Sequence, residues 1–205
     1  VFALALPAAL LSCGDDGPPV EPDPLVVPEG CNPIAADHDC LLPFPSDYYR
    51  TEADGEVRVR IPEAALPAFE GGAPDIIAIH RPDGFSVGTP ILAVLGAPID
   101  DTSLVFWTED VARTLGPESP TLLIDAQTGE PVPHFAEIDP RAADPLRQAL
   151  ILHPLVRLEA GRRYVVGVHG VMSKDGGVIP APRGFSSLRD DAGRAHPLLE
   201  GMSAH

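Results

Sequence analysis

The sequence predicts a mainly β fold built from many short strands, and three observations support this prediction. The 205 residues include 25 prolines and 19 glycines, which end helices and interrupt strands. Nevertheless, 44% of the chain is hydrophobic, which is enough for a substantial core. Several runs of four to seven residues are apolar or alternate between apolar and polar, as strands do. Together these features favour a β-sandwich with irregular loops and short helices.

The expected strands lie about 10 to 15 residues apart along the chain. They are residues 56–61, 75–80, 91–95, 103–107, 121–124, 132–138, 148–152 and 164–171. Residues 125–130 (DAQTGE) join two of these runs, and their Asp and Gly predict a hairpin there. Only residues 108–115 and 186–203 have a helical pattern, and neither is long.

The turn before the last expected strand sharpens the fold prediction. A leucine, Leu158, precedes a turn with Gly161, and Tyr164 then opens an alternating strand. This is the pattern of a tyrosine corner, in which the phenol bonds to the backbone just upstream. The stretch resembles immunoglobulin-like and fibronectin-like modules of bacterial surfaces, which implies a β-sandwich of that type over residues 31–185. The alternative is an ordinary tyrosine at the edge of a strand.

The first twelve residues predict export. They carry no charge, and they are too few to cross a bilayer as a helix, which needs about 20 apolar residues. Residues 1–12 are therefore interpreted as the core of a signal peptide. Residue 1 is Val and no basic stretch precedes the apolar run, so we expect the natural start to lie upstream.

The cysteine after this run predicts a lipid anchor. Residues 10–13 (LLSC) resemble the lipobox of bacterial lipoproteins, which implies that Cys13 is lipidated and becomes the first mature residue. The following Gly14 and Asp15 favour the outer membrane of the cell envelope. Residues 13–30 are acidic and rich in proline, as expected of an extended tether. The alternative is an ordinary cleaved signal peptide in which Cys13 has no role.

The two remaining cysteines predict a disulfide. With Cys13 assigned to lipid, Cys31 and Cys40 enclose a short polar loop, and in an exported protein such a pair is oxidised. Closing this loop stabilises the fold by about 2 to 3 kcal/mol on the chain-entropy estimate.

Charge and motif content exclude several classes of partner. Acidic residues outnumber basic ones by 30 to 14, and the net charge of −16 argues against a nucleic-acid partner. No glycine loop suited to phosphate is present, so no nucleotide cofactor is predicted. The seven histidines are scattered without metal-binding spacing. Residues 37–39 (DHD) are the one cluster of ligand-like side chains, and we interpret them as a polar loop tip rather than a cation site; no metal is predicted.

Residues 84–88 (GFSVG) match the G-x-S-x-G motif of the hydrolase nucleophile elbow. The elbow needs a strand that runs into the first glycine and a helix that leaves the serine. Here residues 82–83 (PD) precede the motif and residues 89–90 (TP) follow it, so a loop between two strands is the better interpretation. No catalytic residue is predicted. Strand alternation places one of Phe106 and Trp107 in the core, and Trp107 is the expected one; an exposed platform of both rings is the alternative.

The whole layout resembles the N-terminal region of exported bacterial lipoproteins related to lipases and esterases, over roughly residues 31–205. The motifs that carry this resemblance are residues 40–49 (CLLPFPSDYY), 83–91 (DGFSVGTPI), 124–139 (IDAQTGEPVPHFAEID) and 150–171 (LILHPLVRLEAGRRYVVGVHGV). The resemblance implies that this β region precedes an α/β-hydrolase domain that carries the catalytic residues. Residues 186–205 are then the start of a helical connection to that missing C-terminal domain.

The expected function is that of a non-catalytic, surface-tethered β module of such a lipoprotein. Its expected partners are the membrane, through the lipid on Cys13, and a C-terminal hydrolase domain. One alternative is a stand-alone cell-envelope binding lipoprotein for a sugar, peptide or protein, which would use loops at one end of the sandwich. A further alternative is a complete ester hydrolase with Ser86 as its nucleophile.

Overall fold

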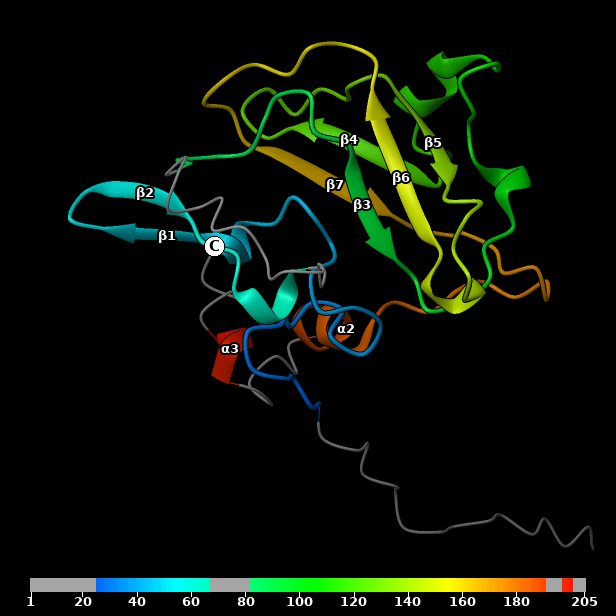
Figure 1. Cartoon of the computed structure of the whole chain (residues 1–205). Helices are drawn as coiled ribbons and strands as arrows, with labels where there is room; N and C mark the ends of the chain where they lie inside the picture. The colour runs from blue at the N-terminus through cyan, green and yellow to red at the C-terminus, as the bar shows by residue number, and fades with distance from the viewer. Residues whose placement is uncertain (1–24, 67–81, 191–196, 201–205) are drawn as a thin grey trace, which may run out of the picture.

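The computed structural model describes residues 25–66, 82–190 and 197–200 (Figure 1). Within these residues the prediction of a mainly β protein with short helices is confirmed. The strands pair antiparallel into one three-stranded sheet, β3-β6-β5, and two two-stranded sheets, β1-β2 and β4-β7. The sheets do not close into a continuous sandwich. The expected strand at residues 75–80 lies outside the described residues.

All of the described elements are short. The strands are β1 Arg50–Ala53, β2 Glu56–Val59, β3 Ile91–Val94, β4 Thr121–Asp125, β5 His134–Ile138, β6 Ala149–Pro154 and β7 Tyr164–Val168. The 3-10 helices are η1 Asp47–Tyr49, η2 Glu63–Ala65, η3 Asp101–Ser103, η4 Val111–Leu115 and η5 Pro145–Arg147. The α-helices are α2 Arg183–Arg189 and α3 Pro197–Glu200.

The three-stranded sheet has one buried and one partly exposed face. In register, Leu152 of β6 lies between Ile91 of β3 and Ala136 of β5, and all three are buried. The neighbouring positions alternate to the opposite, outer face, because successive side chains of a strand point to opposite sides. Glu137 of β5 is one of these outer residues and is only partly buried.

The main core lies between the three-stranded sheet and the β4-β7 pair, which is behind it in Figure 1. Both sheets contribute to a cluster of buried side chains. Its members are Ile91, Ile99, Leu104, Leu123, Val132, Ala136, Leu150, Leu152 and Val171. Burying each of the larger side chains contributes about 1.5 to 3 kcal/mol, so this cluster holds the two sheets together.

The expected strand at residues 103–107 is wrong. Residues 101–103 form η3, which begins where the Asp100 carboxylate accepts the Thr102 N–H. Leu104 and Val105 are then both buried, and the Val105 carbonyl accepts one hydrogen bond from the Ala136 N–H of β5. The chain therefore touches the edge of the sheet at a single point and turns away.

The expected hairpin is correct at its turn and wrong beyond it. The Gly129 N–H donates to the Asp125 carbonyl at 2.8 Å, and the Val132 N–H donates to the Leu123 carbonyl at 2.7 Å. After that, β4 pairs with β7 and β5 pairs with β6. Pro131 and Pro133 have no N–H to continue the ladder, so the two strands separate into different sheets.

The remaining differences concern short elements. The expected helix at 108–115 is the 3-10 helix η4, and the helical pattern of 186–203 is represented by α2, which starts earlier, and α3. The sequence does not predict strand β1, because three of its four residues, Arg50, Thr51 and Glu52, are polar; all four are exposed. The strand pairs with β2 through Asp54 and Gly55, whose φ angles of 55° and 76° suit a two-residue Asp-Gly hairpin.

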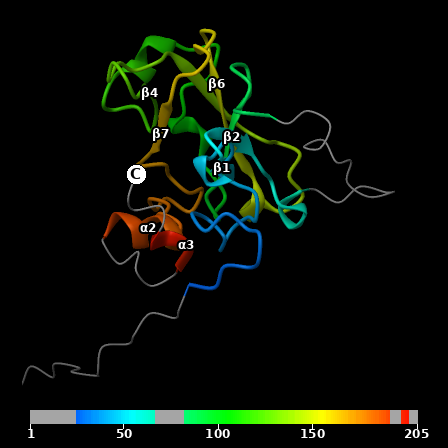
Figure 2. The same ribbon diagram turned by 90° about the vertical axis from the view of Figure 1, so that its left-hand side faces the viewer.

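The chain segment around the disulfide packs against α2. Figures 1 and 2 show α2 and α3 beside the first described residues, below the strands. A Cβ atom on Gly184 would lie 1.8 Å from the Pro33 carbonyl oxygen, so only glycine fits this contact. Next to it, the Phe185 N–H donates to the Ile34 carbonyl at 3.0 Å. Of the expected tether, residues 25–30 are described, and Leu25 is buried.

Candidate functional site

A tight turn at residues 106–109 presents two large aromatic side chains to solvent. The Glu109 N–H donates to the Phe106 carbonyl at 2.9 Å, and the Glu109 carboxylate accepts the Phe106 N–H at 3.2 Å. These two bonds close the turn from both sides. Trp107 is 61% exposed and Phe106 is 37% exposed. The prediction that Trp107 belongs to the core is therefore wrong, because Leu104 and Val105 occupy the core positions instead.

The exposed rings continue into a row along the sheet, which we call the aromatic row: Trp107, Phe106, Phe135 and His153. The centroids of Trp107 and Phe106 are 5.8 Å apart, and Phe106 meets Phe135 edge to face at 6.3 Å. The imidazole of His153 stacks on Phe135 at 4.6 Å, with 13° between the ring planes. Phe135 and His153 face each other across the β5-β6 pair, so the sheet register sets their contact.

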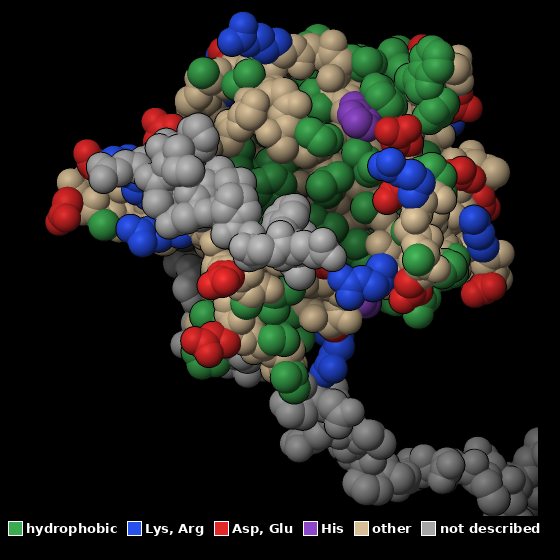
Figure 3. Space-filling view, viewed as in Figure 1, with side chains coloured by type: hydrophobic (Ala, Val, Ile, Leu, Met, Phe, Trp, Pro, Cys, Tyr) green, Lys and Arg blue, Asp and Glu red, His purple; other side chains and the backbone are tan. Residues whose placement is uncertain are grey.

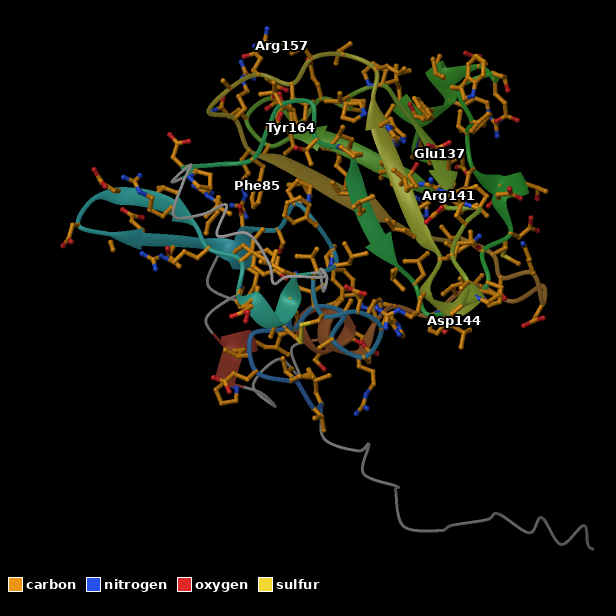
Figure 4. All side chains as sticks on the ribbon, in the orientation of Figure 1. Phe85, Glu137, Arg141, Asp144, Arg157 and Tyr164 are labelled. Carbon is orange, nitrogen blue, oxygen red and sulfur yellow. A yellow bond between two sulfur atoms is a disulfide. The ribbon has the colours of Figure 1, made fainter. Side chains whose placement is uncertain are left out.

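A polar pair stands beside the His153 end of the row. The Nε2 of His153 lies 2.9 Å from Oε1 of Glu137, the next residue but one along β5 from Phe135. Figure 4 labels Glu137 on β5, and Figure 3 shows hydrophobic side chains gathered on this outer face of the sheet with a histidine among them. Because both groups are partly exposed, the pair adds little to stability; its effect is to fix the orientation of the imidazole ring.

A shallow hollow of about 470 Å³ adjoins the aromatic row, and His153 belongs to both. The hollow lies between the G-x-S-x-G loop and the connection from β6 to β7. It is lined by Ser86, Val87, Gly88, Pro90, His153, Pro154, Leu155, Val156 and Arg157. Figure 4 labels Arg157 on the β6-β7 connection.

Ser86 sits in this hollow without the surroundings of a nucleophile. Residues 82–90 form turns and loop, with β3 beginning at Ile91, so neither the strand nor the helix of an elbow flanks the serine. The Ser86 hydroxyl oxygen accepts the Gly88 N–H at 3.3 Å. Among the described residues no hydrogen bond joins Ser86 to a histidine, and the Nε2 of His153 faces Glu137. A serine nucleophile needs a base within hydrogen-bond reach, and this arrangement does not supply one.

Three other residues singled out from the sequence, Cys31, Cys40 and Tyr164, make structural contacts. Cys31 and Cys40 form the predicted disulfide. The Tyr164 hydroxyl oxygen accepts the Glu159 N–H at 2.9 Å, so the phenol does reach back to the upstream turn. Cys13 lies outside the described residues. No described helix has the length and apolar character needed to cross a membrane.

The carboxylates of residues 37–39 serve the local fold. Asp37 accepts the Arg183 N–H of α2 at 3.1 Å. Asp39 accepts the Leu41 and Leu42 N–H groups and forms an ion pair with Arg147 at 2.7 Å. Across the part of the chain that the structure describes, no group of three or more His, Cys, Asp or Glu side chains is placed to hold a metal ion.

A second hollow, of about 410 Å³, lies at the start of β7. The Arg162 guanidinium crosses it to Asp125 at 2.6 Å and to Glu159 at 2.7 Å. The backbone N–H of Gln127, and then Arg162, hold the pKa of the Asp125 carboxyl below its usual value. This network is internally paired and braces the turn against β4, so we assign it a structural role.

Comparison with known proteins adds no relative: no family model, curated protein or solved structure matches this chain. The candidate site therefore rests on its own geometry. Sequence reasoning named Phe106, Trp107 and Ser86 but missed Phe135, Glu137 and His153. The sequence does indicate that Phe135 and Glu137 share one face of an expected strand, because they are two residues apart. It does not indicate which strand pairs with this one, and that pairing brings His153 beside them.

Proposed function

We propose that this chain is a non-catalytic β module of a bacterial cell-envelope lipoprotein. In this proposal a lipid on Cys13 holds the module at the outer membrane, and the acidic, proline-rich residues that follow act as a spacer. The module is the N-terminal part of a lipase- or esterase-like protein, whose hydrolase domain it positions. No nucleic acid, metal or cofactor takes part.

One observation carries the non-catalytic part of the proposal: the surroundings of Ser86. The G-x-S-x-G motif supplies a serine in an exposed loop whose hydroxyl already accepts a backbone hydrogen bond. The histidine on the same hollow, His153, uses its Nε2 for Glu137 and its ring face for Phe135. Nucleophile and base are both present in the sequence, but they are not assembled into a catalytic pair.

The immunoglobulin-like or fibronectin-like interpretation of the fold belongs to the same proposal. It is supported by the core shared between the β3-β6-β5 sheet and the β4-β7 pair. The bond from the Glu159 N–H to the Tyr164 hydroxyl is a second support, because a tyrosine corner makes a contact of this kind.

The aromatic row favours a second candidate, a stand-alone binding lipoprotein of the cell envelope. Exposed rings at a fixed spacing are costly to leave in water, and they are characteristic of surfaces that bind. Both candidates share a non-catalytic module at the cell surface. In the first candidate the ligand is bound for an attached hydrolase domain, whereas in the second candidate ligand binding is itself the function.

An ester hydrolysis assay tests the absence of catalysis. The purified chain and the variant Ser86→Ala are expected to release p-nitrophenol from p-nitrophenyl butyrate at the same rate as buffer, because no histidine of the described residues is hydrogen-bonded to Ser86. A known esterase, added to the same reactions, serves as the positive control. A rate above buffer that disappears in Ser86→Ala would show that the nucleophile is active and would contradict the proposal.

A further inference from the structure

We propose that the aromatic row is a binding surface for a neutral glycan, a polysaccharide or oligosaccharide of the cell's surroundings. This inference goes beyond the proposed function, since it assigns a site and a ligand class. It stands on three observations: the exposure of the rings, the fixed geometry of the row and the polar groups at its two ends.

The first observation is that a specific backbone turn exposes the two rings. The turn that exposes Phe106 and Trp107 is closed by two hydrogen bonds to Glu109, one from each direction. Trp107, the single tryptophan of the chain, is 61% exposed. A large aromatic side chain held in water by a specific turn is unfavourable for an isolated domain, so its position indicates an interaction.

The second observation is that the rings are held in place relative to one another. Phe106 packs edge to face on Phe135, an arrangement that aromatic pairs prefer, and Phe135 is fixed by stacking on His153. Tryptophan and phenylalanine also have few rotatable bonds, so immobilising them on binding costs little entropy. The row is therefore a preorganised surface, and Trp107 is its most exposed aromatic ring.

The third observation is that hydrogen-bonding groups flank the rings. The Glu137–His153 pair stands at one end, and Glu109 with its partner Arg113, 3.5 Å away, stands at the other. Each pair contains both a donor and an acceptor. The hollow beside His153 adds open space for parts of a ligand that extend past the rings.

These features match the chemistry of a sugar. One face of a pyranose ring carries C–H groups with partial positive charge, which suits the negative face of an aromatic ring. Its hydroxyls lie around the rim and both donate and accept hydrogen bonds, as the flanking pairs do. An anionic ligand fits poorly, because the chain carries a net charge of −16 and carboxylates stand at both ends of the row. A compact apolar ligand also fits poorly, because the hollow is shallow and open.

Native gel electrophoresis in gels that contain a soluble polysaccharide tests the inference with the whole chain. Mixed-linkage β-glucan, hydroxyethyl cellulose and glucomannan are the neutral probes, and alginate is the anionic control. At least one neutral probe is expected to retard the wild-type chain and to shift the emission of Trp107 to the blue. Trp107→Ala is expected to raise the dissociation constant about tenfold or more, as the loss of a central aromatic anchor does.

Two further variants keep the result specific to the row. Trp107→Phe retains an aromatic face and is expected to keep most of the binding. Phe185→Ala removes an aromatic side chain of similar exposure, 45%, from α2 and is expected to bind as the wild type does. Thermal unfolding of each variant verifies that the fold is intact.

Several results would overturn the inference. They are the absence of retardation by every neutral probe, unchanged binding by Trp107→Ala, and retardation by alginate alone. A shift of Trp107 emission with oligolysine but with no glycan would instead identify a cationic partner. Ester hydrolysis that depends on Ser86 would end the proposed function and leave this inference standing, so the two fail separately.

Discussion

At the scale of single residues, His134 shows how the core determines a protonation state. The side chain is fully buried, and its Nδ1 lies 2.9 Å from the Val132 carbonyl, which can only accept. Nδ1 therefore carries the proton, and Nε2 accepts from the Thr121 hydroxyl at 3.0 Å. Burial lowers the pKa of His134 because it disfavours the charged imidazolium.

This arrangement predicts that acid destabilises the fold. The folded-state pKa of His134 lies below that of the unfolded chain, so below about pH 6.5 the unfolded state binds a proton that the folded state does not. The free energy of unfolding is expected to fall from pH 7 to pH 5, by at most about 1.4 kcal/mol per pH unit from this residue. Urea unfolding at several pH values measures it.

The matched variants are His134→Gln and His169→Gln. The first removes the buried titrating group and is expected to flatten the loss of stability between pH 7 and pH 5. The second changes an exposed histidine and is expected to leave the loss as it is. An equally steep loss in His134→Gln would show that other groups cause it.

At the scale of elements, α2 depends on tertiary contacts for its existence. A helix of seven residues is too short to be stable alone in water. Its first turn instead docks on the disulfide loop through three contacts, which are the close approach of Gly184 to Pro33 and the hydrogen bonds from Phe185 to Ile34 and from Arg183 to Asp37.

Substituting Gly184 by alanine is therefore expected to destabilise the protein, although Gly→Ala in a helix ordinarily stabilises it by up to about 1 kcal/mol. The new Cβ would meet the Pro33 carbonyl, and such overpacking costs about 1 to 3 kcal/mol. Gly177→Ala is the control, since nothing lies within 4 Å of a Cβ there. Chemical denaturation gives both values, and equal stability of the two variants would refute the tight contact.

Elements also show where sequence reasoning works and where it stops. The buried strands β3, β4 and β6 were predictable because apolar runs bounded by turn residues lie in them. Residues 103–107 have the same apolar character, but local bonds from Asp100 and Glu109 turn the backbone away from the sheet. The Asp-Gly pair at 54–55 could have indicated the β1-β2 hairpin, which the polar composition of β1 concealed.

The candidate site was predictable only in part for a related reason. Exposure of Trp107 depends on which side chains fill the core, and Leu104 and Val105 were equally apolar candidates. The contact between Phe135 and His153 depends on the pairing of β5 with β6, which are separated by a loop that contains η5. Periodicity gives the face of each strand but not the identity of its neighbour.

At the scale of the whole molecule, the proposed lipid anchor is related to the acidic composition of the chain. A chain with a net charge of −16 is repelled by an anionic membrane surface, and under the proposed function a lipid on Cys13 would hold it there against this repulsion. In the same proposal, the acidic, proline-rich residues after Cys13 would act as a spacer between the folded part and the bilayer.

The proposed lipidation predicts a distinct behaviour for Cys13→Ser. In cells that export the protein, the wild-type chain is expected in the membrane fraction, and mass spectrometry should find acyl chains on its N-terminal cysteine. Cys13→Ser is expected in the soluble fraction, because it has no thiol to modify. A wild-type chain with a free thiol at Cys13 in the soluble fraction would contradict the anchor.

The docking of α2 on the disulfide loop also brings the two ends of the described chain to one side of the molecule (Figure 1). The first described residues and α3 lie at one pole, whereas β6 ends and β5 begins at the other (Figure 1). The turn at residues 106–109 contacts this second pole, because Phe106 packs edge to face on Phe135 of β5. If the proposed anchor holds the chain through its first residues, the turn that carries Trp107 would point away from the attached surface, toward a polymer in the medium (Figure 1).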